Sequence, residues 1–130
     1  MIVVTGGAGY IGSHCSHLLI EKGHSVTVID NLSKGFMRAV PKAAKFYEGN
    51  VGDKNLVKQI LTENNIEAVI HFAAFIEVED STLNPIKYYQ NNTVNTVNLI
   101  EACNESGVFK FIFSSTAAIY GQPDVVPVPE

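Results

Sequence analysis

The stretch IVVTGGAGYIG, residues 2–12, organises the sequence around it. Its first four residues form a short apolar run that stops at a glycine, which indicates a buried β-strand. Gly6, Gly9 and Gly12 follow, and apolar residues then recur at helical intervals until Gly23, which can end a helix in a left-handed conformation. A strand, a glycine loop and a helix in this order predict a site for a phosphate group.

The three glycines of this loop have different expected roles. The first permits a tight turn, the second lets the backbone approach a pyrophosphate, and the third lets helix and strand pack closely. Asp30 stands 18 residues after Gly12, at the end of the next predicted strand. A carboxylate there can accept hydrogen bonds from an adenine-ribose diol and would repel a 2′-phosphate, so the pattern favours NAD over NADP. The alternative is a solvated aspartate that begins a turn with Asn31.

Strands and helices alternate along the rest of the chain. The further strands are predicted at residues 25–30, 45–48, 68–72 and 110–114. Loops are expected between the other elements, the longest of them at residues 31–44, 73–84 and, with Pro123, Pro127 and Pro129, from 121 onward. Strands separated by helices pair in parallel through right-handed crossovers, so the fold class predicted is α/β, a doubly wound parallel sheet.

Three helices are expected between these strands. The first ends at Gly23, the second follows Asp53 as its N-cap, and the third begins at Asn84 and Pro85 and ends near Gly107. Apolar residues at helical spacing mark the face of each helix expected to pack inward: Ile11, Cys15, Leu18 and Leu19 in the first, Leu56, Val57, Ile60 and Leu61 in the second, and Tyr89, Thr93, Val97 and Ile100 in the third.

The composition excludes several classes of protein. The chain has 130 residues, which fits one domain, and 46% of them are hydrophobic, too many for a disordered chain. Its formal net charge of −4 argues against a nucleic-acid binder. The sequence has no apolar run of about 18 residues and no secretory signal, so no membrane partner and a cytoplasmic location are expected. Cys15 and Cys103 are expected to be reduced, buried thiols, and no metal site is expected at His14 and His17.

Four blocks of sequence resemble the extended short-chain dehydrogenase/reductase family, which includes the NAD-dependent epimerases and dehydratases. The glycine spacing of residues 6–12 is the GxxGxxG variant of that family. The other blocks are VIHFAA at 69–74, YYQNN at 88–92 and FIFSSTAAIYG at 111–121, which are similar to the UDP-sugar epimerases in particular. The resemblance runs from Met1 to Glu130. It implies a Rossmann fold, NAD as cofactor, and a UDP-sugar substrate that is epimerised through a 4-keto intermediate.

The resemblance also implies roles for individual residues. Thr116 takes the place of the family's Ser/Thr that hydrogen-bonds the reacting sugar hydroxyl and is the catalytic candidate. Apart from the resemblance, His71 lies inside an apolar run and is expected to be a core histidine, and the acidic residues at 77, 79 and 80 are expected to be solvated. The implied cofactor contacts are Gly6, Gly9, Tyr10, Ile11 and Gly12 at the pyrophosphate, Asp30, Asn31, Leu32, Ser33, Lys34 and Gly35 around the adenosine ribose, Asn50 and Val51 at the adenine, and Phe72, Ala73, Ala74, Phe75, Ile76 and Asn91 farther along the cofactor.

The chain departs from the family pattern at several points. Asn50 stands where aspartate is usual, although its side-chain carbonyl can still accept a bond from adenine, and Ile76 stands where some members have lysine. None of the five tyrosines has a lysine four residues later, which is the spacing of the family's general base and its partner.

This departure leads to an expectation about the whole chain. Residues 1–130 are expected to be an NAD-binding Rossmann domain, incomplete at its C-terminal side, without a sugar-nucleotide domain and inactive alone. The full-length form is expected to be a homodimer. Two alternatives remain: another nucleotide-sugar dehydratase or reductase of the same superfamily, and a non-catalytic NAD-binding module.

Overall fold

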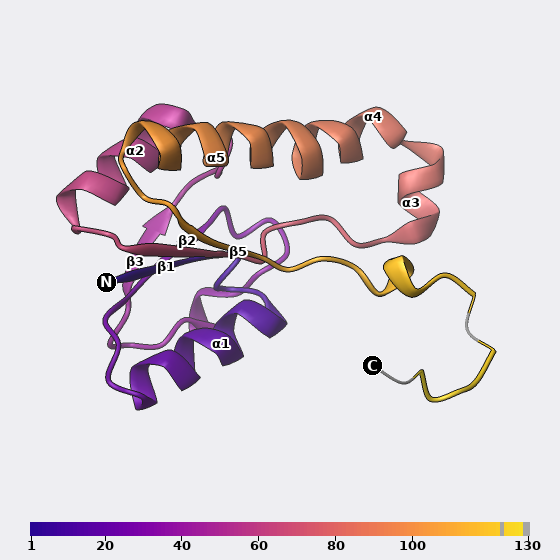
Figure 1. Cartoon of the computed structure of the whole chain (residues 1–130), viewed down its shortest axis with the longest axis horizontal. Coiled ribbons are helices and arrows are strands. Elements are labelled where there is room, and N and C mark those ends of the chain that lie inside the picture. Colours follow the sequence, from indigo (N-terminus) through magenta and orange to yellow (C-terminus); the bar gives the residue numbers. More distant parts are fainter. Residues whose placement is uncertain (123, 129–130) are drawn as a thin grey trace.

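A parallel five-stranded sheet forms the centre of the computed structural model, which describes residues 1–122 and 124–128 (Figure 1). Of the expected C-terminal loop, Pro123 and residues 129–130 lie outside the described part. The strand order is β3-β2-β1-β4-β5, which is the order of a doubly wound Rossmann sheet, so the predicted fold class is confirmed. The strands are β1 Ile2–Thr5, β2 Val26–Asp30, β3 Lys45–Glu48, β4 Ala68–His71 and β5 Lys110–Phe113.

Helices cover both faces of the sheet. Helix α1, Tyr10–Glu21, lies on one face, and α2, Lys54–Glu63, packs beside α5, Asn95–Glu105, on the other (Figure 1). Adjacent residues of β1 point to opposite faces, so Val3 belongs to the core beneath α2 and α5 and Val4 to the core on the other side. Because both faces are covered, β1 and β2 are apolar along most of their length.

The third predicted helix is one long helix with an unusual turn in its middle. It begins with α4, Pro85–Tyr88, passes through η2, a π-helical segment at Tyr89–Val94, and continues as α5. Pro85 stands at its start as predicted. Asn84 occupies the N-cap position but its side chain makes no capping hydrogen bond; the side-chain NH2 group donates to Asp80 Oδ1 at 2.8 Å.

The loop predicted before Asn84 contains a short helix, so that expectation was wrong. Helix α3, Val78–Leu83, buries no residue, and it therefore lacks the apolar spacing that marks a helix in a sequence. Its turns are supported locally, since the hydroxyls of Ser81 and Thr82 both donate to the carbonyl oxygen of Val78. A further short turn, η1 at Met37–Ala39, lies within the long loop after β2.

One of the three predicted inward faces was wrong, and another was only partly correct. In α1, Leu19 packs against the core as predicted and Cys15 is partly buried, but Ile11 and Leu18 are more than half exposed. The fully buried residues of α1 are Gly12, Ser13 and Ser16. In the long helix, Tyr89, Thr93, Val97 and Ile100 are exposed, and Leu99, Ala102 and Cys103 are buried instead. Small residues let α1 lie close against β1 and β2, which apolar spacing does not reveal. The face of α2 is confirmed, with Val57, Ile60 and Leu61 buried.

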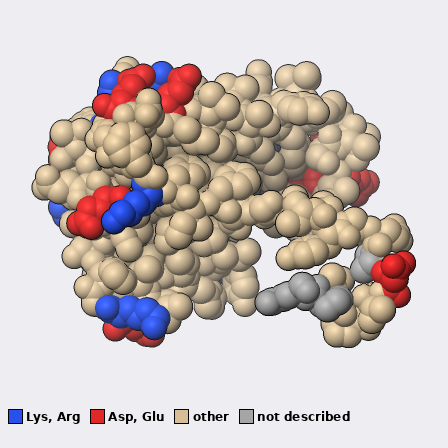
Figure 2. Space-filling view, in the orientation of Figure 1, with Lys and Arg blue, Asp and Glu red and all other residues tan. Residues whose placement is uncertain are grey.

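The surface and the cysteines complete the description. On the face drawn in Figure 2, acidic and basic side chains lie together in small groups on the left, and acidic groups stand alone on the right. One of the mixed groups joins α2 to α5, where Lys54 and Lys58 pair with Glu101 and Glu105. Neither cysteine is in a disulfide; Cys103 is buried as predicted, whereas Cys15 is only partly buried. None of the helices in residues 1–122 and 124–128 has the length and apolar character needed to cross a bilayer.

Candidate functional site

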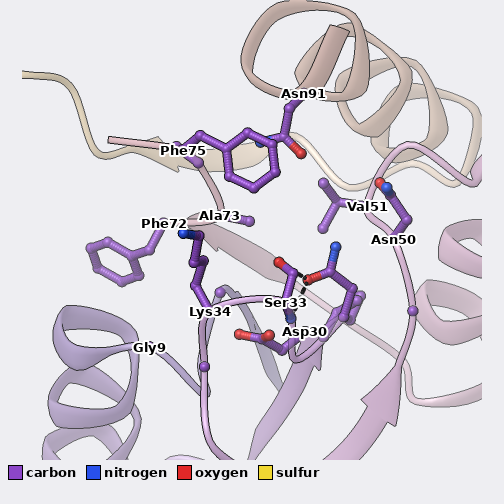
Figure 3. Close-up of a pocket in the computed structure, with 16 residues that line it drawn as sticks. Gly9, Asp30, Ser33, Lys34, Asn50, Val51, Phe72, Ala73, Phe75 and Asn91 are labelled. Carbon is purple, nitrogen blue, oxygen red and sulfur yellow. Dashed lines mark hydrogen bonds between the residues drawn. The ribbon is translucent and has the colours of Figure 1, made fainter. Parts of the chain in front are cut away.

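A pocket opens at the carboxyl ends of β1, β2 and β4, where parallel sheets of this kind bind ligands (Figure 3). We call it the first pocket. It brings together most of the expected cofactor residues: Gly6, Gly9, Asp30, Asn31, Ser33, Lys34, Gly35, Asn50, Val51, Phe72, Ala73, Ala74, Phe75 and Asn91. Ile29 and Gly49 also line it and were not predicted.

Two glycines of the loop are required by packing. Gly6 has a positive φ of 67°, and a Cβ there would lie 2.8 Å from the backbone nitrogen of Ala73. A Cβ on Gly12 would collide with the carbonyl oxygen of Gly6, so Gly12 lets α1 start directly against the loop. The tight turn expected at Gly6 and the close packing expected at Gly12 are therefore both present in the structure.

Gly9 differs, because packing restricts it less. It lines the first pocket, and a Cβ there would have one close contact, the Gly6 carbonyl oxygen at 3.2 Å. Gly9 is also the N-cap of α1 and supplies no side-chain cap. The amides of the first turn of a helix lack partners within the helix, and they carry its positive partial charge. The start of α1 therefore presents an electropositive backbone to the pocket.

Asp30 is buried, and its carboxylate holds two loops at once. Oδ2 accepts a hydrogen bond from the Ala8 amide at 3.0 Å, and Oδ1 accepts one from the Leu32 amide at 2.8 Å. It is therefore more than a solvated residue that begins a turn. A carboxylate has about four acceptor positions, so both oxygens keep capacity for further donors. The contact with the glycine loop was not predicted.

An ion pair links the loop after β2 to the loop after β4. Lys34 Nζ lies 2.8 Å from Glu77 Oε1, and in Figure 3 the Lys34 side chain extends toward Phe72. Glu77 also accepts a hydrogen bond from the Tyr88 hydroxyl at 3.2 Å. The hydrogen bond from Lys34 is the main reason why the pKa of Glu77 falls to about 2. The expectation that Glu77 is merely solvated was wrong.

Three asparagine side chains shape the other side of the first pocket, and two of them belong to the long helix. Asn50 Oδ1 accepts a hydrogen bond from the Gly52 amide at 2.7 Å, and it keeps a second lone pair for a ligand. Asn98 of α5 donates to the Gly52 carbonyl oxygen at 3.0 Å, which ties this loop to the helix. Asn91 of η2 lines the pocket and donates to Asn92 Oδ1 at 2.9 Å. The sequence did not point to Asn98 or Asn92.

A second pocket adjoins the first and shares with it the wall formed by residues 72–75. Thr116 and Ile76 line this second pocket. The Thr116 hydroxyl oxygen accepts a hydrogen bond from the Ala118 amide at 3.2 Å and caps the turn η3, Ala117–Tyr120. Because the oxygen acts as acceptor in that bond, the hydroxyl hydrogen can be donated to another group.

Four expected cofactor residues line neither pocket. Tyr10 and Ile11 are 81% and 61% exposed, and the Tyr10 ring lies 4.6 Å from that of His14. Leu32 packs against the core on the α1 side, and Gly12 is buried beneath the glycine loop. Within the described residues, no three His, Cys, Asp or Glu side chains gather as metal ligands would.

The sequence of this chain is similar to those of a known protein family. The profile of the NAD dependent epimerase/dehydratase family matches residues 2–130. The UDP-glucose 4-epimerase of Azospirillum brasilense is 45% identical over 129 residues, which cover 99% of this chain and 37% of that protein. The chain thus spans well under half the length of the curated relatives that it matches.

Two solved structures are similar over nearly the whole chain. The UDP-glucose 4-epimerase from Brucella ovis in complex with NAD has a TM-score of 0.91 at 41% identity, covering 99% of this chain and 39% of that one. The enzyme from Bifidobacterium longum in complex with NAD⁺ and UDP has a TM-score of 0.90 at 38% identity, covering 99% of this chain and 41% of that one.

Proposed function

The chain belongs to the NAD dependent epimerase/dehydratase family, and from that premise we propose that it is the NAD-binding part of a UDP-glucose 4-epimerase. The longer protein would interconvert UDP-glucose and UDP-galactose through a 4-keto sugar. The observation that carries the proposal is the first pocket, where the glycine loop, Asp30 and Asn50 meet at one edge of the sheet. The relatives named above, one of which was crystallised with NAD and UDP, support it.

The residues of the first pocket fit a dinucleotide. Gly9 and the start of α1 would hold the pyrophosphate, because a backbone without a side chain and a positive helix end suit an anion. Asp30 would accept hydrogen bonds from the adenosine ribose, and Asn50 would meet the adenine. The shared wall at residues 72–75 would guide the rest of the cofactor toward the second pocket. We propose for the other cofactor contacts that the family resemblance implied the same parts of the cofactor as in the sequence analysis.

The second pocket would receive the reacting part of the sugar. NAD, when bound, supplies the hydride chemistry, and the protein supplies position and electrostatics. Thr116 would donate its hydroxyl hydrogen to the oxygen of the reacting sugar hydroxyl, while the Ala118 amide holds the Thr116 oxygen in place. None of the tyrosines in these 130 residues has a lysine four positions on, so we propose that this chain alone turns over no substrate.

The longer protein would also act as a homodimer with a UDP-sugar as its substrate. Tyr89, Val97 and Ile100 form an exposed apolar row on the long helix, which supports an interface there.

Binding of NAD and NADP by the 130-residue chain tests the proposal. Isothermal titration calorimetry should show NAD binding about tenfold tighter than NADP, since Asp30 repels the 2′-phosphate. Asp30→Asn should reduce this preference to about threefold or less, because the amide carries no charge. Glu48→Gln, at the neighbouring strand end in register with Asp30, is the matched control and should keep the preference. A wild-type chain that binds no NAD would contradict the proposal, and full preference in Asp30→Asn would contradict the role of Asp30.

Turnover gives a separate test. The purified chain, mixed with UDP-galactose and NAD, should form no UDP-glucose. Clear formation of UDP-glucose would show that the general base lies within these residues and would overturn the proposed inactivity.

A further inference from the structure

A chain of hydrogen bonds runs from β1 through β4 to the long helix, beneath the wall shared by the two pockets. Thr5 Oγ1 lies 2.6 Å from His71 Nδ1, and His71 Nε2 lies 2.9 Å from Thr96 Oγ1. Thr96 Oγ1 in turn donates to the backbone carbonyl of Asn92 at 2.7 Å. Thr5 is fully buried and His71 is 3% exposed, so solvent cannot replace these partners without local opening.

The positions of the protons follow from the last acceptor in this series of hydrogen bonds, the backbone carbonyl of Asn92. A backbone carbonyl can only accept, so Thr96 uses its single hydroxyl hydrogen on Asn92. Thr96 must then accept from His71, which places a proton on Nε2. Burial lowers the pKa of His71 to about 4, so the ring is neutral at neutral pH and carries only one proton. With that proton on Nε2, Nδ1 is unprotonated and accepts a hydrogen bond from the Thr5 hydroxyl. Each hydrogen in the chain has one acceptor.

Both ends of this series of hydrogen bonds reach the wall that the two pockets share, residues 72–75. At one end, Thr5 Oγ1 accepts hydrogen bonds from the amides of Phe72 and Ala73, at 3.3 and 3.4 Å. At the other end, the Asn92 side chain accepts from the Phe75 amide and donates to the Phe75 carbonyl, both at 2.9 Å. Asn92 belongs to η2, and such π-helical turns occur frequently at functional sites.

We propose that His71 is a positioning residue, which ties the π-helical turn of the long helix to β1 and thereby fixes the wall at residues 72–75. It acts through Thr96 and Asn92 on one side and through Thr5 on the other. Its effect on ligand affinity rests on the proposed function, because a dinucleotide that runs through both pockets would contact this wall. A histidine that only filled the core would leave the wall unchanged when the Thr96 hydroxyl is lost.

Amide hydrogen exchange tests the mechanical part. Thr96→Val removes the hydroxyl at nearly constant shape, Thr96→Ser restores it, and Thr93→Val is the matched control, an exposed threonine in the same helix. Loss of one bond should speed exchange of the Phe75 amide about tenfold in Thr96→Val. Thr96→Ser and Thr93→Val should exchange like the wild type. The Ile60 amide lies inside α2 at a fully buried residue and serves as the reporter of global stability, so its exchange rate should not change in Thr96→Val.

Two outcomes of the exchange experiment would overturn the proposal. One is an unchanged Phe75 rate in Thr96→Val. The other is equal acceleration of the Phe75 and Ile60 amides, which would mean that the hydroxyl contributes only general stability. Nitrogen NMR of His71 is an independent measurement, expected to show a proton on Nε2. A proton on Nδ1 in the wild type would contradict the chain of donors derived above.

Ligand binding tests the functional part. Thr96→Val should weaken NAD binding about tenfold, and Thr96→Ser and Thr93→Val should bind like the wild type. Unchanged affinity in Thr96→Val would refute the link between the wall and the ligand. If the wild type binds no NAD, the proposed function fails, but hydrogen exchange and the His71 proton still decide whether His71 positions the wall.

Discussion

At the scale of single residues, buried polar groups connect distant parts of the chain at the candidate site. Asp30 joins the glycine loop to the loop after β2, and His71 joins β1 to the long helix. Each group has hydrogen-bond partners for its polar atoms, which is what its removal from water requires. These side chains therefore stabilise the site through the same atoms that shape it.

The buried His71 should make stability depend on pH. Its pKa in the folded protein is lowered from 6.5 to about 4 by burial. Between these values the unfolded chain binds a proton that the folded protein does not, so the stabilisation is fully present above pH 6.5 and is lost as the pH falls toward 4. The slope should be about 1.4 kcal/mol per pH unit at most, or roughly 3 kcal/mol in all. Urea unfolding between pH 7 and 4 measures it.

Carboxylates also titrate in this range, so a variant must isolate the contribution of His71. His71→Asn lacks the titrating ring, and its free energy of unfolding should fall less steeply with pH than that of the wild type. The difference between the two curves is the contribution of His71. Parallel curves for both proteins would show that His71 does not titrate differently in the folded and unfolded states.

At the scale of elements, a helix was predicted correctly where the residues that determine its start and its buried face lie close together in the sequence. Helix α2 was predicted correctly, because its cap and its apolar face both lie within a few residues. The inward face of α1 was only partly correct and that of the long helix was wrong, because tertiary packing decides which side of a helix is buried. It buries Gly12 and Ser16 in α1 and Leu99 and Ala102 in the long helix. Helix α3 was missed because it buries nothing.

The cap of α2 should be a measurable part of stability. The Asp53 side chain accepts hydrogen bonds from the amides of Asn55 and Leu56, both at 3.1 Å. Asp53→Ala should reduce the free energy of unfolding by about 1 kcal/mol and lower Tm by about 4 °C, because both amides lose a protein partner. Asp53→Asn should keep most of the stability. Thermal unfolding followed by circular dichroism measures both, and equal Tm values for all three proteins would argue against the cap.

At the scale of the whole molecule, β5 is an outer strand with one unpaired edge in the described sheet. Ile112 and Phe113 are 61% and 55% exposed, and Phe109 just before the strand is 78% exposed. An exposed apolar edge strand offers a template for pairing with another chain. The 130-residue chain should therefore self-associate.

Light scattering of the purified chain tests this expectation. The wild type should show a mass well above 14.1 kDa, and Ile112→Lys should lower it, because a lysine on an edge strand opposes pairing. Leu18→Lys, at an exposed apolar position on α1, is the matched control and should leave the mass unchanged. A wild-type chain that is monomeric at all concentrations would contradict the expectation.

The amino-acid sequence was sufficient to predict the order of the five strands and of the three longer helices between them, the parallel sheet, the glycine loop and the strand-end location of Asp30. These follow from local patterns, since turn glycines, caps and apolar runs act over a few residues. The contacts that connect the parts of the candidate site do not follow from local patterns. Asp30 with Ala8, Lys34 with Glu77, and His71 with Thr5 and Thr96 join residues that are distant in sequence. Only the packing of the helices on the sheet brings such residues within hydrogen-bond distance, because a directional bond of about 3 Å depends on three-dimensional position and not on residue type.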